Sequence, residues 1–128
     1  MIFGIGTDIV RVDRIAVALD RFGEKFARRV LTPGEIDEFM VTKRPAAFLA
    51  KRFAAKEATA KAMGRGFRDG LTLRQIGISH DRYGKPGLEY FGVARGLKDT
   101  LGIGESFVSV ADEEQYAVAY VTLLKQAV

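Results

Sequence analysis

The sequence contains no cysteine and a single histidine, His80, and it has no long apolar run. The absence of cysteine excludes disulfides, thiolate metal sites and a cysteine nucleophile. A zinc centre or a serine–histidine couple would depend on His80 alone, which lies beside a turn in "SHDRYG" and is expected on the surface. No apolar run approaches the roughly 20 residues of a membrane span, and the start "MIFGIGTDIV" lacks the basic segment of a signal peptide. We therefore expect a cytoplasmic protein that does not contact membranes.

The composition is that of a folded protein of one domain, residues 1–128, with 48% hydrophobic and 28% charged residues. The net charge of +4 and the pI near 9.5 favour anionic partners such as nucleotides, nucleic acid or an acidic protein. A surplus of solvated lysine and arginine explains the same charge, so the composition does not choose among these partners.

The first half of the chain predicts one strand followed by helices. Residues 2–11 are rich in β-branched side chains, and helical spacing follows, with Asp13 as a candidate N-cap and Gly23 as the end of the first helix. Thr32, Pro33 and Glu35 form a start signal for a later helix. The expected helices cover residues 12–23, 24–31, 32–40 and a long one from Pro45 to Gly64 or Gly66.

The second half changes to the alternation of strands. Residues 74–92 predict two strands around "DRYGKP", and residues 105–125 predict two more around "ADEE", with a short helix between the pairs at 93–102. No repeat or long linker interrupts the chain. The fold class is therefore α+β, with an antiparallel β-sheet packed against helices that include one long central helix.

In the first strand, alternation places Gly4, Gly6 and Asp8 on one side, so two missing side chains leave room beside one carboxylate. Glycine inside a strand often marks the close approach of a ligand or another backbone. Two interpretations stay open: Asp8 serves a ligand site, or it turns the chain while the glycines pack against a helix.

In "KRFAAKEATAKAMG", residues 51–64, helical spacing aligns Phe53, Glu57 and Lys61. Alanines flank this row, which lets another backbone come close. Glu57 and Lys61 are expected at the edge of the core, although an ordinary exposed pair of this kind, which contributes about 0.3–0.5 kcal/mol, has the same spacing.

Asp8 and Glu57 come from different elements and suit Mg²⁺, which binds hard oxygen ligands and keeps water or phosphate in its shell. The cations near them in the predicted structure, Arg52, Lys56, Lys61 and Lys85, would suit a phosphorylated substrate. There is no Walker loop and no GxGxxG, which argues against P-loop and Rossmann enzymes.

These segments resemble a known family. "GIGTDIVRVDRI" at 4–15 and "KRFAAKEATAKAMG" at 51–64 are similar to the two signature segments of the holo-[acyl-carrier-protein] synthases, small bacterial 4'-phosphopantetheinyl transferases. "GKP" at 84–86 and "SFVSVADEEQYAVAYV" fit the same pattern, so the resemblance covers essentially the whole chain. It implies the fold of those transferases.

The resemblance also implies an activity, which is transfer of 4'-phosphopantetheine from coenzyme A to a serine of apo acyl carrier protein, releasing adenosine 3',5'-bisphosphate in support of fatty acid biosynthesis. It implies Mg²⁺ on Asp8 and Glu57, with Glu57 and Lys61 as the catalytic residues. The residues near coenzyme A would be Arg52, Lys61, Gly64, Lys85 and Pro86.

The resemblance further implies a homotrimer with active sites between subunits, and a basic first helix that receives the carrier protein. The residues implied for that contact are Arg14, Arg21, Phe22, Phe26 and Arg28. The chain departs from many relatives at Ala111 in "SVAD", where they have histidine, so no role of that histidine applies here.

A function from another class fits the charge as well, namely a non-catalytic module whose basic surface holds RNA or a nucleotide. The chain lacks the aromatic strand of an RNA-recognition motif and helix-turn-helix spacing, which argues against this alternative and against a nucleic-acid partner.

Overall fold

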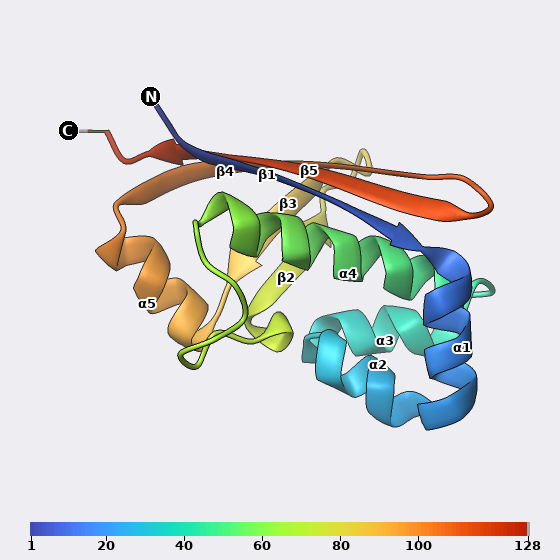
Figure 1. The fold of residues 1–128 in the computed structure, drawn as a ribbon. Coiled ribbons are helices and arrows are strands. Elements are labelled where there is room, and N and C mark those ends of the chain that lie inside the picture. The colour runs from blue at the N-terminus through green and yellow to red at the C-terminus, as the bar shows by residue number, and fades with distance from the viewer. Residues whose placement is uncertain (128) are drawn as a thin grey trace.

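The structure is a computed structural model that describes residues 1–127, and it places one long helix beneath a three-stranded sheet (Figure 1). No helix of this part of the chain has both the length and the apolar character needed to cross a membrane. The elements are, in order, β1 (Ile2–Arg11), α1 (Val12–Phe22), α2 (Glu24–Val30), α3 (Pro33–Val41), α4 (Pro45–Ala62), the 3₁₀ turn η1 (Leu73–Gln75), β2 (Ile76–His80), β3 (Pro86–Tyr90), α5 (Gly92–Thr100), β4 (Ile103–Asp112) and β5 (Tyr116–Lys125).

The larger sheet is antiparallel, with the order β1-β5-β4, so the last strand lies in the middle. Asp8 pairs with Ala119 and Val110 pairs with the same residue from the other side. Strands β2 and β3 form a separate antiparallel pair behind α4, while α1, α2 and α3 gather at one end of the molecule and α5 lies at the other (Figure 1). The predicted mixture of helices and antiparallel strands is confirmed.

The contact between β1 and α4 is close because two glycines of β1 face the helix. A Cβ on Gly4 would lie 2.0 Å from the carbonyl oxygen of Ala62, and a Cβ on Gly6 would lie 2.0 Å from that of Ala58. Such distances leave no room for any side chain. The glycines therefore do pack against a helix, and the alanine flank of α4 is the surface that they meet.

The helix ends follow the predicted signals with one exception. Thr32 and Glu35 form a capping box at the start of α3, Pro45 opens α4, and Gly23, with φ +61°, ends α1. The prediction that Asp13 caps α1 is wrong, since the N-cap residue is Arg11. Asp13 lies inside the first turn and forms an ion pair with Arg11 at 2.8 Å.

The two faces of the larger sheet differ in exposure. Ala117, Ala119 and Val121 of β5 point toward α4 and are buried, whereas the alternate residues point outward. That outward surface, here called the outer sheet face, carries apolar side chains that are 40–65% exposed: Ile5, Ile9, Phe107, Val118 and Tyr120.

Candidate active site

Asp8, Glu57 and Lys61 meet at the contact between β1 and α4. Nζ of Lys61 donates hydrogen bonds to Oδ1 of Asp8 and to the carbonyl oxygen of Thr7, both at 3.0 Å. The Lys61 side chain remains 53% exposed, whereas that of Asp8 is 16% exposed. The strand and the helix thus bring together two residues that are 53 positions apart in the chain.

Glu57 is half-buried beside this pair, and its pKa is raised. Burial is the largest cause, the negative charge of Asp8 adds to it, and the positive charge of Lys61 acts in the opposite direction. The two carboxylates of Asp8 and Glu57 thus interact electrostatically. We call Asp8 and Glu57 the carboxylate pair.

The carboxylate pair fits Mg²⁺ by its chemistry. Residues 1–127 contain no cluster of three or more His, Cys, Asp or Glu side chains suited to a metal ion, so a metal here would take two carboxylates from the chain at most. Mg²⁺ is commonly bound in this way, by one or two carboxylates with the rest of its shell from water and substrate phosphates. Glu57, with its raised pKa, would be stabilised as an anion by such a cation.

A second polar site lies on another side of α4. A pocket of about 150 Å³, here called the Arg52 pocket, opens between α4, β2, the β2–β3 turn and β4. Its polar residues and turn residues are Lys51, Arg52, His80, Gly84, Pro86 and Asp112. The structure thus places Arg52 and Pro86 in the lining of one pocket.

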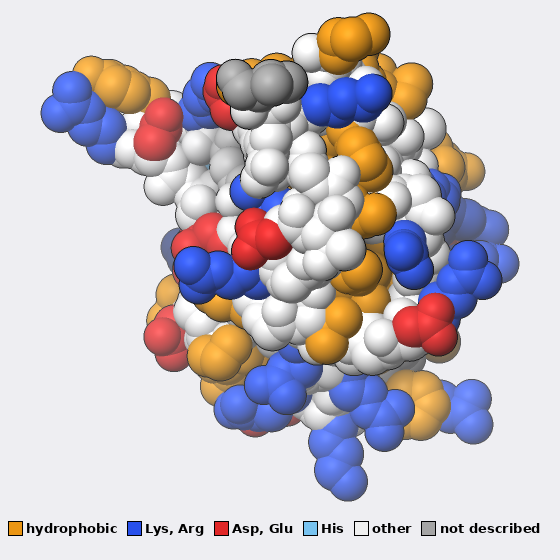
Figure 2. Space-filling view, turned by 90° about the vertical axis from the view of Figure 1, so that its left-hand side faces the viewer, with side chains coloured by type: hydrophobic (Ala, Val, Ile, Leu, Met, Phe, Trp, Pro, Cys, Tyr) orange, Lys and Arg blue, Asp and Glu red, His pale blue; other side chains and the backbone are white. Residues whose placement is uncertain are grey.

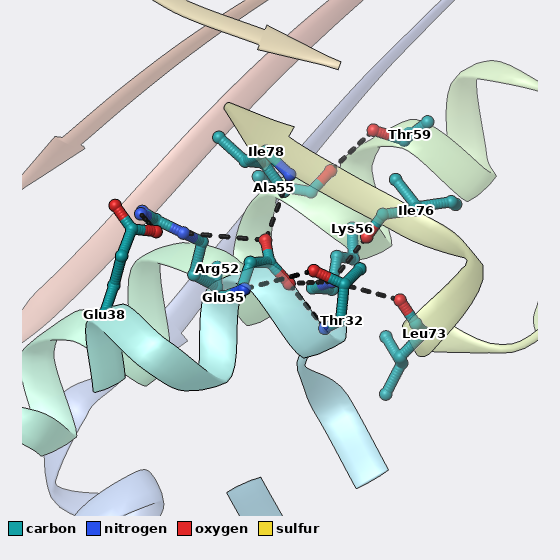
Figure 3. A network of polar contacts seen from close by, with 10 residues as sticks. All are labelled: Thr32, Glu35, Glu38, Arg52, Ala55, Lys56, Thr59, Leu73, Ile76 and Ile78. Carbon is teal, nitrogen blue, oxygen red and sulfur yellow. Dashed lines mark hydrogen bonds and ion pairs between the residues drawn. The ribbon is translucent and has the colours of Figure 1, made fainter. Parts of the chain in front are cut away.

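Arg52 is 7% exposed, yet its guanidinium group makes few hydrogen bonds. Nη2 donates to Oε2 of Glu38 at 3.3 Å, and the group lies 4.4 Å from the ring centroid of Phe48. Nε is 3.6 Å from Oε2 of Glu35 and has no hydrogen-bond partner (Figure 3). An arginine carries five N–H donors, so a buried one with a single hydrogen bond keeps capacity for an anion.

Lys56 is fully buried, so the prediction that it lies near a phosphorylated substrate is wrong. Its Nζ donates to Oε1 of Glu35 at 2.7 Å, to the carbonyl oxygen of Leu73 at 3.1 Å and to that of Ile76 (Figure 3). All three ammonium protons are used by the protein. Burial lowers the pKa of Lys56, and Glu35 opposes that change.

Glu35 joins these cations to the start of its own helix, α3, and to β2. Its Oε1 also accepts from the backbone N–H of Thr32 at 2.9 Å, and its Oε2 accepts from that of Ile78 at 3.0 Å. Removing one partner of such a buried pair costs about 3–5 kcal/mol, because the other charge remains uncompensated. Glu35 and Lys56 therefore hold α3, α4 and the start of β2 together.

The carboxylate pair and the Arg52 pocket are separate within one chain. Arg52 and Glu57 are five positions apart on α4, which corresponds to about 140° around the helix axis. None of Asp8, Glu57 and Lys61 lines the Arg52 pocket. A ligand that contacts both sites at once needs either a long reach around α4 or two copies of the chain.

The other residues expected near coenzyme A are more peripheral. Gly64 lies just after α4 with φ +79° and is exposed, and Lys85 is exposed on the β2–β3 turn beside the pocket. Oδ1 of Asp81 accepts from the backbone N–H groups of Tyr83 and Lys85 and fixes that turn. The turn geometry holds Pro86 at the pocket while it leaves the Lys85 side chain in solvent.

The residues expected to receive a carrier protein lie on α1 and α2. Arg14, Arg21, Phe22 and Arg28 are exposed and Phe26 is half-buried. Figure 2 shows Lys and Arg side chains gathered along its lower edge, the end of the molecule where α1 and α2 lie in Figure 1. Arg28 is partly neutralised by Glu24, with Nε and Oε2 2.7 Å apart.

Sequence reasoning missed four residues around Arg52. The sequence pattern assigns no role to Glu38, Lys51 or Asp112, and it predicts only that His80 is on the surface; His80 is exposed, but it also lines the pocket. Arg52 and Glu38 lie on two different helices, so no local sequence pattern predicts their contact. Asp112 alternates with Ala111 on β4, and it is Asp112 that faces this pocket.

Comparison with known proteins decides the family. The model of the 4'-phosphopantetheinyl transferase superfamily matches residues 4–121. The chain belongs to this family. A holo-[acyl-carrier-protein] synthase of Nitrosococcus oceani is 54% identical over 126 residues, which are 98% of this chain and 82% of that protein. The resemblance found in the two signature segments is thereby confirmed.

Solved structures agree in fold. The crystal structure of the holo-[acyl-carrier-protein] synthase from Neisseria meningitidis superimposes with a TM-score of 0.93 at 46% identity and covers 98% of this chain and 100% of that one. The enzyme from Bacillus anthracis, solved in complex with CoA (3',5'-ADP), gives a TM-score of 0.83 at 34% identity over 99% of each chain. This chain is therefore a phosphopantetheinyl transferase of the holo-[acyl-carrier-protein] synthase type.

Proposed function

We propose that this phosphopantetheinyl transferase moves the 4'-phosphopantetheine group of coenzyme A to a serine of apo acyl carrier protein, as the bond between phosphorus and the leaving oxygen breaks and adenosine 3',5'-bisphosphate departs. The observation that carries the proposal is the electrostatic coupling of the Asp8 and Glu57 carboxylates, with Lys61 hydrogen-bonded to Asp8. Carboxylates alone would repel a diphosphate, so such a pair suits a phosphate substrate that arrives with a divalent cation.

Asp8 and Glu57 would hold Mg²⁺, which when bound draws electron density from the phosphates and offsets their charge. Lys61 is 53% exposed, so its ammonium group could turn from Asp8 toward a bound phosphate and balance charge there. Positioning and charge compensation are the main contributions to phosphoryl transfer.

Arg52, Lys85 and Pro86 would bind the nucleotide part of coenzyme A in and beside the Arg52 pocket, with Gly64 near the end of α4. The uncommitted donors of Arg52 support this role. Since that pocket and the carboxylate pair lie on different sides of α4, we infer that one coenzyme A is held by two copies of the chain.

A homotrimer accounts for this division and for the outer sheet face. Exposed apolar side chains that are contiguous on a sheet usually mark an interface. Ile5 and Ile9 of β1, with Val118 and Tyr120 of β5, form such a surface, and covering it would bury side chains now 40–65% exposed. The α1–α2 surface stays free to receive the carrier protein, in a cytoplasmic pathway of fatty acid biosynthesis.

The test is a transfer assay. Purified chain, Mg²⁺, coenzyme A and bacterial apo acyl carrier protein should yield a carrier heavier by one phosphopantetheine in a mass spectrum. Asp8→Asn and Glu57→Gln should each reduce the rate by about two orders of magnitude or more, and chelation of divalent cations should stop the reaction. A complete absence of the mass shift with several bacterial carriers would overturn the proposal.

A further inference from the structure

Arg52 has two acidic neighbours on α3, and they hold it differently. Glu35 is 3% exposed and is fixed by Lys56 and by two backbone N–H groups, so it cannot move without opening the core. Glu38 has a side chain that is 54% exposed and touches Arg52 through one hydrogen bond of 3.3 Å. Glu35 is a permanent neighbour of Arg52, while Glu38 can rotate into solvent.

The Glu38 carboxylate occupies the donor that an incoming anion would need. Of the Arg52 nitrogens, Nη2 bonds to Glu38 and Nε has no partner. The pKa of His80 is lowered by burial and by Arg52, and Glu38 opposes this change, so the carboxylate acts on a residue that lines the Arg52 pocket. A phosphate in this pocket would meet the negative charge of Glu38 at the same guanidinium group.

We propose that Glu38 is an internal competitor for the anion site of Arg52, which it occupies until a phosphate group of the ligand replaces it. This inference rests on the proposed function for its ligand, coenzyme A. A phosphate offers more negative charge than a carboxylate and can accept from two guanidinium nitrogens at once, so it displaces a half-exposed carboxylate.

The charges around the pocket support an exchange of this kind. Lys51 is 3.8 Å from Asp112, and Nη2 of Arg52 is 3.3 Å from Glu38, so both basic side chains of the pocket have an acidic neighbour. A pocket balanced in this way keeps its cations ordered without a ligand. The balance also lowers its affinity for an anion, because each neighbour repels the ligand.

The experiment compares coenzyme A binding to the unsubstituted chain and to Glu38→Gln by isothermal calorimetry. Glu38→Gln should bind about two- to tenfold more tightly, the range expected for loss of one partly exposed charge contact. Asp37→Asn is the matched control, since Asp37 is the preceding residue of α3, carries the same charge and faces a different groove, with Arg28 and Arg74. Its effect should stay below about twofold.

An Arg52→Gln background tests whether the effect passes through the guanidinium group. There, Glu38→Gln should no longer change the affinity. Unchanged or weaker binding by Glu38→Gln in the native background would overturn the inference. An equal gain in Asp37→Asn would overturn it as well, because the cause would then be net charge.

A second measurement needs no ligand. His80 is the only histidine, so its imidazole gives a single set of NMR signals, and Glu38→Gln should lower the pKa of His80. No change in that pKa would overturn the competitor role even if coenzyme A binds. Failure of coenzyme A to bind the unsubstituted chain would instead count against the proposed function.

Discussion

Nζ of Lys61 lies 3.0 Å from Oδ1 of Asp8, in a hydrogen bond that crosses from α4 to β1. Glu57 lies one helical turn before Lys61. The charge of Asp8 raises the pKa of Glu57, and the charge of Lys61 lowers it. The three residues are electrostatically coupled, so a change of charge at Asp8 or Lys61 changes the pKa of Glu57.

The first prediction concerns the pKa of Glu57 in metal-free protein. Asp8→Asn should lower that pKa, because it removes a neighbouring negative charge, and Lys61→Met should raise it, because it removes a positive one. NMR titration of the Glu57 carboxyl group measures both changes. If the two substitutions move the pKa in the same direction, or not at all, the three side chains are not coupled as described.

The second prediction is a gain of stability in Glu57→Gln without metal. The pKa of Glu57 is raised on folding above its ordinary 4.5, so the folded chain binds the proton more tightly than the unfolded chain does. Stability from this group is therefore present below the ordinary pKa and is lost as the pH rises through the raised one.

At neutral pH, Glu57→Gln should accordingly increase the melting temperature by about 1–2 °C, and the gain should vanish below pH 4.5. Thermal unfolding in the presence of a chelator, at several pH values, measures it. Glu89→Gln, at an exposed position of β3, is the control and should show no such dependence. The same dependence of melting temperature on pH in Glu57→Gln and the unsubstituted chain would contradict the prediction.

The third prediction concerns the close contact of β1 and α4. In Gly6→Ala the added Cβ would lie 2.0 Å from the carbonyl oxygen of Ala58, so strand and helix must separate. We expect a loss of about 1–3 kcal/mol or more in the free energy of unfolding, together with lower transfer activity, since Asp8 moves away from Glu57. Denaturant unfolding measures the loss.

Gly34→Ala is the matched control for this change, because Gly34 lies in α3 with nothing within 4 Å of an added Cβ. Alanine is favoured over glycine within a helix, so stability should stay equal or rise by up to about 1 kcal/mol. A Gly6→Ala protein as stable as Gly34→Ala would show that the contact can relax.

The local features of this site could be predicted from the sequence, because they depend on short-range patterns. The alternation of β1 placed Gly4, Gly6 and Asp8 on one side, and helical spacing aligned Glu57 with Lys61. The pairing of the two segments came from the family resemblance, and the structure gives its physical basis in the missing side chains of the glycines.

The burial of Lys56 and Arg52 could not be predicted in the same way. Lysine and arginine are usually exposed. Here they are covered by α3, η1 and β2, which are distant in sequence. The capping box of Thr32 and Glu35 was visible, but a cap does not show that its carboxylate also meets two cations of another helix. Such contacts depend on the packing of whole elements.

The fourth prediction concerns the carrier protein. Arg14→Glu and Arg21→Glu should each raise the KM for apo carrier protein about tenfold and flatten its dependence on salt, because both residues are exposed cations of α1. Steady-state assays at two ionic strengths measure this. Arg95→Glu, at an exposed position of α5, has the same charge change and should leave the KM unaltered. Similar losses in all three variants would indicate a general charge effect.

The last prediction concerns the assembly. Sedimentation should show a trimer of the unsubstituted chain, and Ile9→Asp, which places a charge on the outer sheet face, should yield monomers.

The sharing of each active site between two copies is tested by co-expressing Arg52→Gln with Glu57→Gln, each of which should be nearly inactive alone. If each site takes Arg52 from one copy and Glu57 from the next, random assembly of equal amounts leaves about one site in four intact over all trimers, and activity returns accordingly. No recovery in mixed trimers would place both residues of a site in one copy, and coenzyme A would then have to reach around α4.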